Sequence, residues 1–262
     1  MENKFSNIIV NHYNNYNEDE RLLTTKHGSV EFLTTMKYIQ QFATPGCKIL
    51  EIGAATGKYS IVLAKMGYDV TAVDLTPNNI KILKQNAKGI KNLKAFVGDA
   101  LNLNFKDNQF DIVLNFGPMY HLYTEKDKLT AINETIRVAK PNGICMFAYL
   151  THSSIVWGYG VRKNCLSNLK NHLMPDGKIL DDPNEIFSSY FIEDFNNQFL
   201  MFPTKHITTV ATDGIFPTMR DYVDNLTDDD FVTLLNWHYA TCERLDHQGL
   251  SSHMLYICRK IK

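Results

Sequence analysis

The sequence lacks the charge imbalance of proteins that bind nucleic acids or anionic membranes. Its 262 residues contain 27 Lys and Arg against 28 Asp and Glu, a formal net charge of -1. This balance gives no electrostatic reason to expect either partner. No apolar run reaches the ~18 residues that a membrane-spanning helix needs, and the first residues lack the apolar core of a signal peptide. We therefore expect a cytoplasmic protein with no membrane and no nucleic-acid partner.

Cysteine is scarce, and the spacing of the cysteines does not suit disulfides or a zinc site. The five residues are Cys47, Cys145, Cys165, Cys242 and Cys258. They are odd in number and scattered, and no pair has C-x-x-C spacing, so the pattern indicates neither a disulfide framework nor a zinc site. We expect a reduced protein without a metal.

The most informative stretch of the chain is KILEIGAATGKYSIVLAKMGYDVTAVD, residues 48–74. Residues 48–52 form a short apolar run with two isoleucines, which favours a buried strand. Gly53 and Gly57 follow in a turn, where glycine permits positive φ or the close approach of a ligand. Residues 58–66 have a helical pattern, and a second apolar run ends in Asp74. Strand, glycine turn, helix, strand and terminal acid together predict a βαβ unit that binds a nucleoside.

The terminal acid and the turn indicate which nucleoside to expect. Asp74 lies about 20 residues beyond the turn, where a carboxylate accepts hydrogen bonds from ribose hydroxyls. The dinucleotide fingerprint G-x-G-x-x-G is not met, because Ala55 and Lys58 replace its second and third glycines. The mouth of the sheet also carries Glu51, near the end of the first predicted strand, and Asp99, after a later one. A ring of carboxylates suits a cationic ligand better than a pyrophosphate.

The run Glu51-Ile52-Gly53-Ala54-Ala55-Thr56-Gly57 resembles the E-x-G-x-G-x-G motif of class I S-adenosylmethionine-dependent methyltransferases, in their bacterial small-molecule branch. It departs from that motif at Ala55. The segment Gly98-Asp99-Ala100 resembles the family's G-D-A segment, where the acid holds the adenine amino group. The resemblance implies S-adenosylmethionine as cofactor, bound by Glu51, Gly53, Ala54, Gly57, Asp74, Leu75, Asp99, Ala100 and Asn115.

The loop after the predicted strand at residues 110–116 carries the candidate catalytic residues. Ligands of an open α/β sheet bind beyond the carboxyl ends of its strands. The loop resembles a G-P-x-Y-H-L segment of the same branch, and it does not match the N-P-P-Y motif of DNA-amino methyltransferases. His121 is our candidate base, because neutral imidazole can take a proton from a hydroxyl or an amine. Tyr120 is the second candidate. A histidine that only hydrogen-bonds the loop backbone is the alternative.

The segment before the first strand has a different character. Residues 1–47 are expected to form an N-terminal helical cap, with Ser29 as the N-cap of its helix. In the resembled family such a cap often folds over the cofactor, and this implies Tyr13 and Tyr16 as substrate-binding residues, with Arg21 nearby. Packing of these side chains against the core is the alternative.

Beyond residue 150 the alternation of strands and helices stops. Residues 151–204 are rich in aromatics, and they predict a lid or substrate insertion with Trp157 and Tyr120 as substrate contacts. Hydrophobic packing of an ordinary appendage is the alternative. Residues 205–262 contain two further strands and a helix that complete the core sheet, and the resemblance implies that the last strand of the sheet runs antiparallel.

Together these patterns predict an α/β protein with a Rossmann-like, mostly parallel seven-stranded sheet, helices on both faces and a lid inserted after strand 5. The nucleotide-binding core covers residues 48–150. The resemblance implies methyl transfer to a small-molecule acceptor that the sequence does not name. Two alternatives stay open: a protein that binds the cofactor without turnover, and a nicotinamide-dependent oxidoreductase. The sequence does not predict an oligomeric state.

Overall fold

One seven-stranded sheet forms the centre of the molecule. The computed structural model describes residues 24–182 and 187–261. The strand order is β3-β2-β1-β4-β5-β7-β6, and β7 runs antiparallel to both of its neighbours. The strands are β1 (Lys48–Ile52), β2 (Asp69–Asp74), β3 (Leu93–Val97), β4 (Phe110–Asn115), β5 (Ala139–Leu150), β6 (Thr204–Ala211) and β7 (His253–Lys260). This arrangement confirms the predicted fold class, including the single reversed strand.

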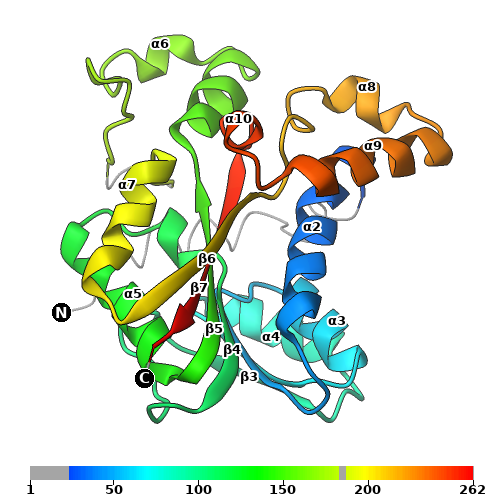
Figure 1. The fold of residues 1–262 in the computed structure, drawn as a ribbon, viewed down its shortest axis with the longest axis vertical. Coiled ribbons are helices and arrows are strands. Elements are labelled where there is room, and N and C mark those ends of the chain that lie inside the picture. Colours follow the sequence, from blue (N-terminus) through cyan, green and yellow to red (C-terminus); the bar gives the residue numbers. More distant parts are fainter. Residues whose placement is uncertain (1–23, 183–186, 262) are drawn as a thin grey trace.

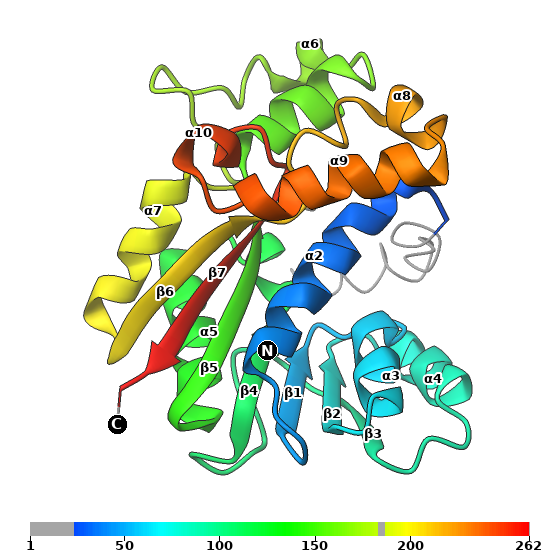
Figure 2. The same ribbon diagram turned by 45° about the vertical axis from the view of Figure 1, so that its right-hand side comes forward.

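Helices cover both faces of the sheet. α5 (Glu125–Val138) and α7 (Ile192–Asn197) lie on one side, whereas α2 (Lys26–Phe42), α3 (Lys58–Lys65) and α4 (Pro77–Asn86) lie on the other (Figure 1). Three later helices, α8 (Arg220–Asp224), α9 (Asp228–Thr241) and α10 (Leu245–Gln248), gather beyond the carboxyl ends of the central strands, where α9 crosses α2 (Figure 2). Because both faces are covered, the central strands are apolar on each side, as in Leu50, Val113 and Leu114, which are fully buried.

Threonine side chains cap the starts of three helices, α2, α5 and α9. Thr124 and Thr227 accept hydrogen bonds at 3.1 Å from the amides of Asp127 and Asp230, as expected of N-caps. The expected cap at Ser29 was wrong, because α2 begins one turn earlier and Thr25 accepts from the amide of Gly28 instead.

Residues 141–143 form a bulge within β5. Asn142 takes a φ of 63°, and the pairing of β4 with β5 shifts register opposite it, between Phe110 and Ile112. The strand therefore continues through a stretch whose Pro-Asn-Gly sequence predicts a turn.

The insertion after β5 divides into two parts. Its first part contains the π-helix η3 (Ser154–Val161) and α6 (Leu166–Leu169), which extend beyond the sheet (Figure 1). Its second part packs on the sheet, where Phe195 stacks on Tyr149 at 3.8 Å and Phe199 stacks on Tyr256 at 4.0 Å between ring centroids. α7 and the short helix η4 (Gln198–Met201) therefore belong to the core. No helix within the described ranges is long and apolar enough to cross a membrane.

Candidate functional site

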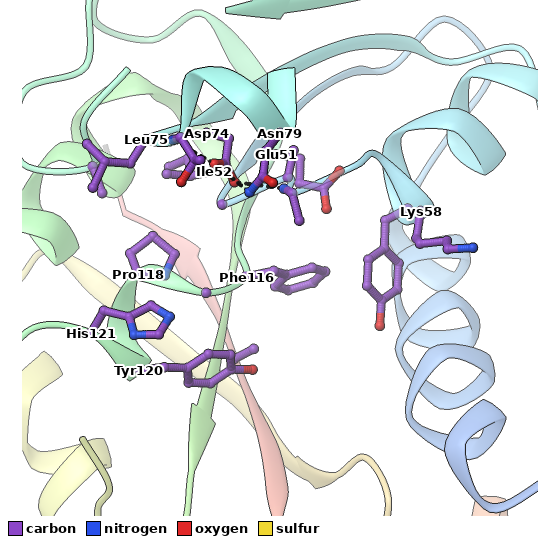
Figure 3. Close-up of a pocket in the computed structure, with 18 of the residues that line it drawn as sticks. Glu51, Ile52, Lys58, Asp74, Leu75, Asn79, Phe116, Pro118, Tyr120 and His121 are labelled. Carbon is purple, nitrogen blue, oxygen red and sulfur yellow. Dashed lines mark hydrogen bonds between the residues drawn. The ribbon is translucent and has the colours of Figure 1, made fainter. Parts of the chain in front are cut away.

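A cavity opens beyond the carboxyl ends of β1, β2 and β4. Its empty volume is about 1190 Å³, part of which is open to solvent. Figure 3 shows Glu51, Asp74 and Asn79 along one side and Tyr120 and His121 along the other, with the ring of Phe116 between them. This is the position that parallel α/β sheets use for ligands.

The glycine turn after β1 is shaped by its contact with the neighbouring loop. Gly53 has a φ of 83°, and a Cβ at this position would lie 2.3 Å from the carbonyl oxygen of Phe116. Gly53 is therefore required by the approach of two loops of the protein. Ala55 also takes a left-handed conformation, with a φ of 44°. Gly57 does not line the cavity; its φ is 94°, and a Cβ there would lie 2.7 Å from Leu83 of α4.

Asp74 lines the cavity and also holds the turn together. Its Oδ2 accepts from the amide of Ala55 at 2.8 Å, and its Oδ1 accepts from the amide of Thr76 at 2.8 Å and from Nδ2 of Asn79 at 3.1 Å. A carboxylate offers about four acceptor positions, so three protein donors leave roughly one for a ligand. Burial raises the pKa of Asp74 despite these hydrogen bonds. The predicted acceptor of ribose hydroxyls is therefore first a structural residue of the turn.

Two further carboxylates face the same space. Glu51 is 2% exposed, and burial raises its pKa to about 7 although the hydroxyl of Ser60 donates to it. Asp99 lines the cavity and accepts from the amide of Leu101 at 2.9 Å. Among the described lining residues Lys58 is the single Lys or Arg. The cavity is therefore acidic, and it favours a ligand with positive charge.

The loop after β4 brings both candidate catalytic residues to the cavity. Tyr120 and His121 both line it, and His121 is 7% exposed with its ring 5.5 Å from that of Phe187. Tyr120 ends the short 3-10 helix η2 (Pro118–Tyr120). The remaining predicted cofactor contacts that line the cavity are Gly53, Ala54, Leu75 and Ala100.

Several predicted site residues are not brought to this cavity. Asn115 is buried in the core, where its Nδ2 donates to Thr135 of α5 at 2.9 Å, because its side chain faces the helix layer. Trp157 is 60% exposed on η3 and is not among the residues that line the cavity. Tyr13 and Tyr16 lie outside the described residues, as does Arg21.

The cavity also has a wall that the sequence analysis missed. Glu31 and Thr35 of α2, Thr212 after β6 and His253 of β7 all line it. His253 follows no parallel strand, and it reaches the site because an antiparallel strand begins at the edge where its neighbours end. The reversed direction of the last strand, which the family resemblance implied, was the available signal.

Residues 50–147 match the protein family described as "Methyltransferase domain". The demethylmenaquinone methyltransferase of Staphylococcus aureus is 36% identical over 103 residues, which are 38% of this chain and 41% of that protein. The chain thus matches about two fifths of the length of this curated relative.

Solved structures share the fold across more of the chain. Phosphoethanolamine N-methyltransferase 1 of Haemonchus contortus, determined with phosphoethanolamine and S-adenosylhomocysteine, is similar with a TM-score of 0.64 and 12% identity, covering 98% of this chain and 48% of that one. The PH0226 protein of Pyrococcus horikoshii is similar with a TM-score of 0.58 and 16% identity, covering 94% and 99%. At these identities the likeness establishes the fold alone.

Proposed function

We propose that this chain, whose residues 50–147 match the family described as "Methyltransferase domain", is a class I S-adenosylmethionine-dependent methyltransferase that transfers a methyl group to a small molecule. The observation that carries the proposal is the acidic cavity at the carboxyl ends of β1, β2 and β4, placed within the matched residues. Glu51, Asp74 and Asp99 stand there on three successive strand ends.

The lining residues suit a cofactor with two cationic groups and no phosphate. Glu51 is a buried carboxylate that gains a partner when a cation binds beside it. The rings of Tyr59 and Phe116 meet edge to face, 5.2 Å apart, on the same wall, and aromatic faces attract sulfonium and ammonium groups. When bound, S-adenosylmethionine supplies an electrophilic methyl carbon and a neutral thioether as leaving group.

The protein's part in the reaction is alignment, exclusion of water and management of one proton. Tyr120 and His121 stand on the loop that faces the acidic wall across the cavity (Figure 3). His121 is a candidate base for an acceptor O–H or N–H. Residues 154–180 extend beyond the same edge of the sheet, and in this proposal they cover the acceptor side as a lid.

The acceptor is of the small-molecule kind. The Staphylococcus aureus relative is named for demethylmenaquinone and the Haemonchus contortus structure for phosphoethanolamine, so this fold serves chemically distant small molecules. Nothing in the near-neutral composition favours a nucleic acid.

Calorimetry with S-adenosylmethionine, S-adenosylhomocysteine and NADH tests the proposal. Binding of the first two raises the melting temperature by mass action. Tighter binding of NADH would replace the proposal with a nicotinamide-dependent oxidoreductase. A panel of amine, hydroxyl and quinol acceptors, followed by release of S-adenosylhomocysteine, separates an enzyme from a protein that only binds the cofactor.

A further inference from the structure

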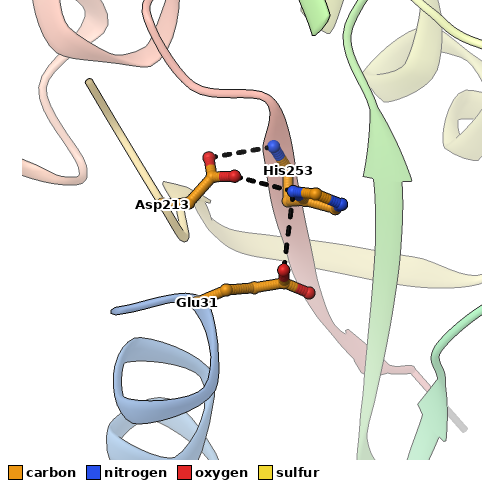
Figure 4. A group of neighbouring side chains, drawn as sticks. All are labelled: Glu31, Asp213 and His253. Carbon is orange, nitrogen blue, oxygen red and sulfur yellow. Dashed lines mark hydrogen bonds and ion pairs between the residues drawn. The ribbon is translucent and has the colours of Figure 1, made fainter. Parts of the chain in front are cut away.

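Methyl transfer as proposed above gives no role to one wall of the cavity. Two carboxylates and an imidazole meet on this wall. Glu31 comes from α2, Asp213 follows β6 and His253 opens β7 (Figure 4). One ligand atom of each lies within 4.8 Å of the others. Glu31 and His253 line the cavity, whereas Asp213 is 2% exposed behind them.

Asp213 is an anchored, ionised carboxylate. Its Oδ1 accepts from the hydroxyl of Ser251 at 2.7 Å and from the amides of Ser252 and His253 at 2.9 and 3.0 Å. Its Oδ2 lies 2.7 Å from Nδ1 of His253. Burial opposes ionisation, but the charge and hydrogen bonds of His253, with the hydroxyl of Ser251, hold the pKa of Asp213 below its usual range.

This anchoring fixes the tautomer and the direction of the imidazole. An ionised carboxylate can only accept, so Nδ1 of His253 carries a proton and donates it to Asp213. Glu31 Oε2 lies 3.5 Å from the same Nδ1. The second ring nitrogen is on the opposite edge and points away from both carboxylates (Figure 4).

Two carboxylates and a histidine are also ligand types for a divalent cation. Four protein donors already approach Asp213, which matches the about four acceptor positions of a carboxylate. A cation at Nδ1 would have to displace the 2.7 Å hydrogen bond that defines the group. The observed contacts therefore favour proton chemistry over metal binding.

We propose that His253, rather than His121, is the general base of the acceptor site, because Asp213 and Glu31 position its ring. The acceptor is an amine or a hydroxyl compound without negative charge. The inference rests on the proposed methyltransferase function. The acceptor nitrogen or oxygen forms its bond to the methyl carbon, and the carbon–sulfur bond breaks with its electron pair left on sulfur. The acceptor's proton passes to Nε2 of His253. The resulting imidazolium lies between two negative charges, while Glu31 repels an anionic acceptor.

The groups that face His253 come from three other segments: Glu31 from α2, Asp213 after β6, and Tyr120 from the loop after β4, whose ring centroid is 6.2 Å away.

The experiment is an NMR titration of ¹³C-histidine-labelled protein, first with S-adenosylhomocysteine and then with S-adenosylmethionine. The His253 signal is assigned by its loss in His253→Gln. If His253 faces the reacting centre, the sulfonium charge should move its titration to lower pH by about half a unit or more. His206, an exposed residue of β6, serves as the internal control and should titrate alike in both complexes.

Identical titration of His253 in the two complexes would overturn the inference, and so would tight binding of Zn²⁺ that abolishes the His253 signal. Lack of affinity for both cofactors would instead refute the proposed function itself.

With an acceptor from the panel, Glu31→Gln should move the acid limb of the kcat/KM profile to lower pH, because one negative charge beside the imidazolium is gone. An unmoved acid limb would remove Glu31 from the positioning role. His206→Gln is the matched substitution, and it should leave both profile and cofactor affinity unchanged.

Discussion

The hydroxyl of Tyr190 donates a hydrogen bond to the backbone carbonyl of Met119 across 3.0 Å, although 71 residues separate the two. Ser188 joins the same loop, since its amide donates to the carbonyl of Tyr120 and its hydroxyl to that of Met119. The loop that carries Tyr120 and His121 is thus held by the second part of the insertion. The insertion therefore sets the position of the candidate catalytic residues, whatever its first part does over the cavity.

Tyr190→Phe should lower the free energy of unfolding by about 0.5–1.5 kcal/mol, the usual net contribution of one hydrogen bond. The matched control is Tyr149→Phe. Tyr149 is a buried neighbour, 6.0 Å away between ring centroids, and its hydroxyl has no hydrogen-bond partner among the described residues. Removing that hydroxyl should leave stability unchanged or raise it. Urea unfolding measures both variants, and equal losses would contradict the anchoring role of Tyr190.

Most of the fold was predictable because the strands are short apolar runs bounded by glycine, proline or an acid. β1 begins and ends where the pattern places it, at residues 48–52. The errors are local choices between similar polar residues. Thr25 and Ser29 are both good N-caps, and only the packing of α2 decides between them. Pro141 and Asn142 predict a turn and have no partner in the ladder, but the pairing of β5 with β4 continues on either side of them, at Ala139 and Ile144.

The site was less predictable, since the type of a residue does not reveal which way its side chain points. Asn115 ends β4 as a ligand-binding residue would, yet its side chain faces α5. The sequence predicted Asp74 as a site residue. It did not predict the three hydrogen-bond donors that the turn directs at this carboxylate, because they depend on backbone geometry that residue spacing does not encode. His253 and Asp213 are 40 residues apart, and they meet only because β6 and β7 pair antiparallel with a particular register. Such long-range pairing cannot be inferred from either segment alone.

Asp74→Ala should weaken binding of S-adenosylhomocysteine by about 1–3 kcal/mol, because a buried ligand hydroxyl loses its acceptor. It should also destabilise the turn, since the amides of Ala55 and Thr76 lose theirs. Asp69→Ala at the opposite end of β2 is the control and should change neither quantity appreciably. Calorimetry and thermal unfolding separate the two effects. A variant that loses stability but keeps full affinity would leave Asp74 a purely structural residue.

Ala55→Gly should leave the free energy of unfolding unchanged or raise it slightly. Relief of the left-handed conformation gains about 1–2 kcal/mol, and the greater freedom of glycine in the unfolded chain costs about 0.4–1 kcal/mol. Cofactor affinity should be kept or improved, since the turn loses only a methyl group. Ala54→Gly is the matched control, because Ala54 is buried and has no positive φ, so this change should destabilise. Equal destabilisation by both changes, seen by thermal shift, would argue against strain at Ala55.

Glu51 should make cofactor binding depend on pH. Its pKa is about 7 because the carboxyl is buried, so at pH 6 most of the free protein carries a proton there. A cationic group beside it favours the carboxylate, and binding should therefore release about one proton at pH 6 and fewer above pH 7. Affinity should rise with pH up to about 7. Calorimetry in buffers of different ionisation enthalpy counts the proton, and Glu51→Gln should abolish it. Wild-type binding without proton release would separate Glu51 from the cofactor's cations.

His238 should make the protein less stable in mild acid. It is buried, its Nε2 lies 3.2 Å from the hydroxyl of Thr34, and burial lowers its pKa to about 4 from an ordinary value of 6.5. Between these two values the unfolded chain binds a proton that the folded protein does not, so the free energy of unfolding falls as pH falls through this window. The loss from this one group should reach about 2–3 kcal/mol near pH 4.

The effect of His238 on stability in acid is obtained by comparing the wild-type protein with a variant that lacks this histidine. The raised pKa of Glu51 acts in the opposite direction over much of the same range, because there the folded protein holds a proton that the unfolded chain has released. Urea unfolding of wild type and His238→Gln at pH 7.5 and pH 4.5 isolates the histidine. The variant should lose less stability than wild type on acidification, whereas Glu51→Gln should lose more. If wild type and His238→Gln fall in parallel, the buried neutral imidazole is not the origin of the acid sensitivity.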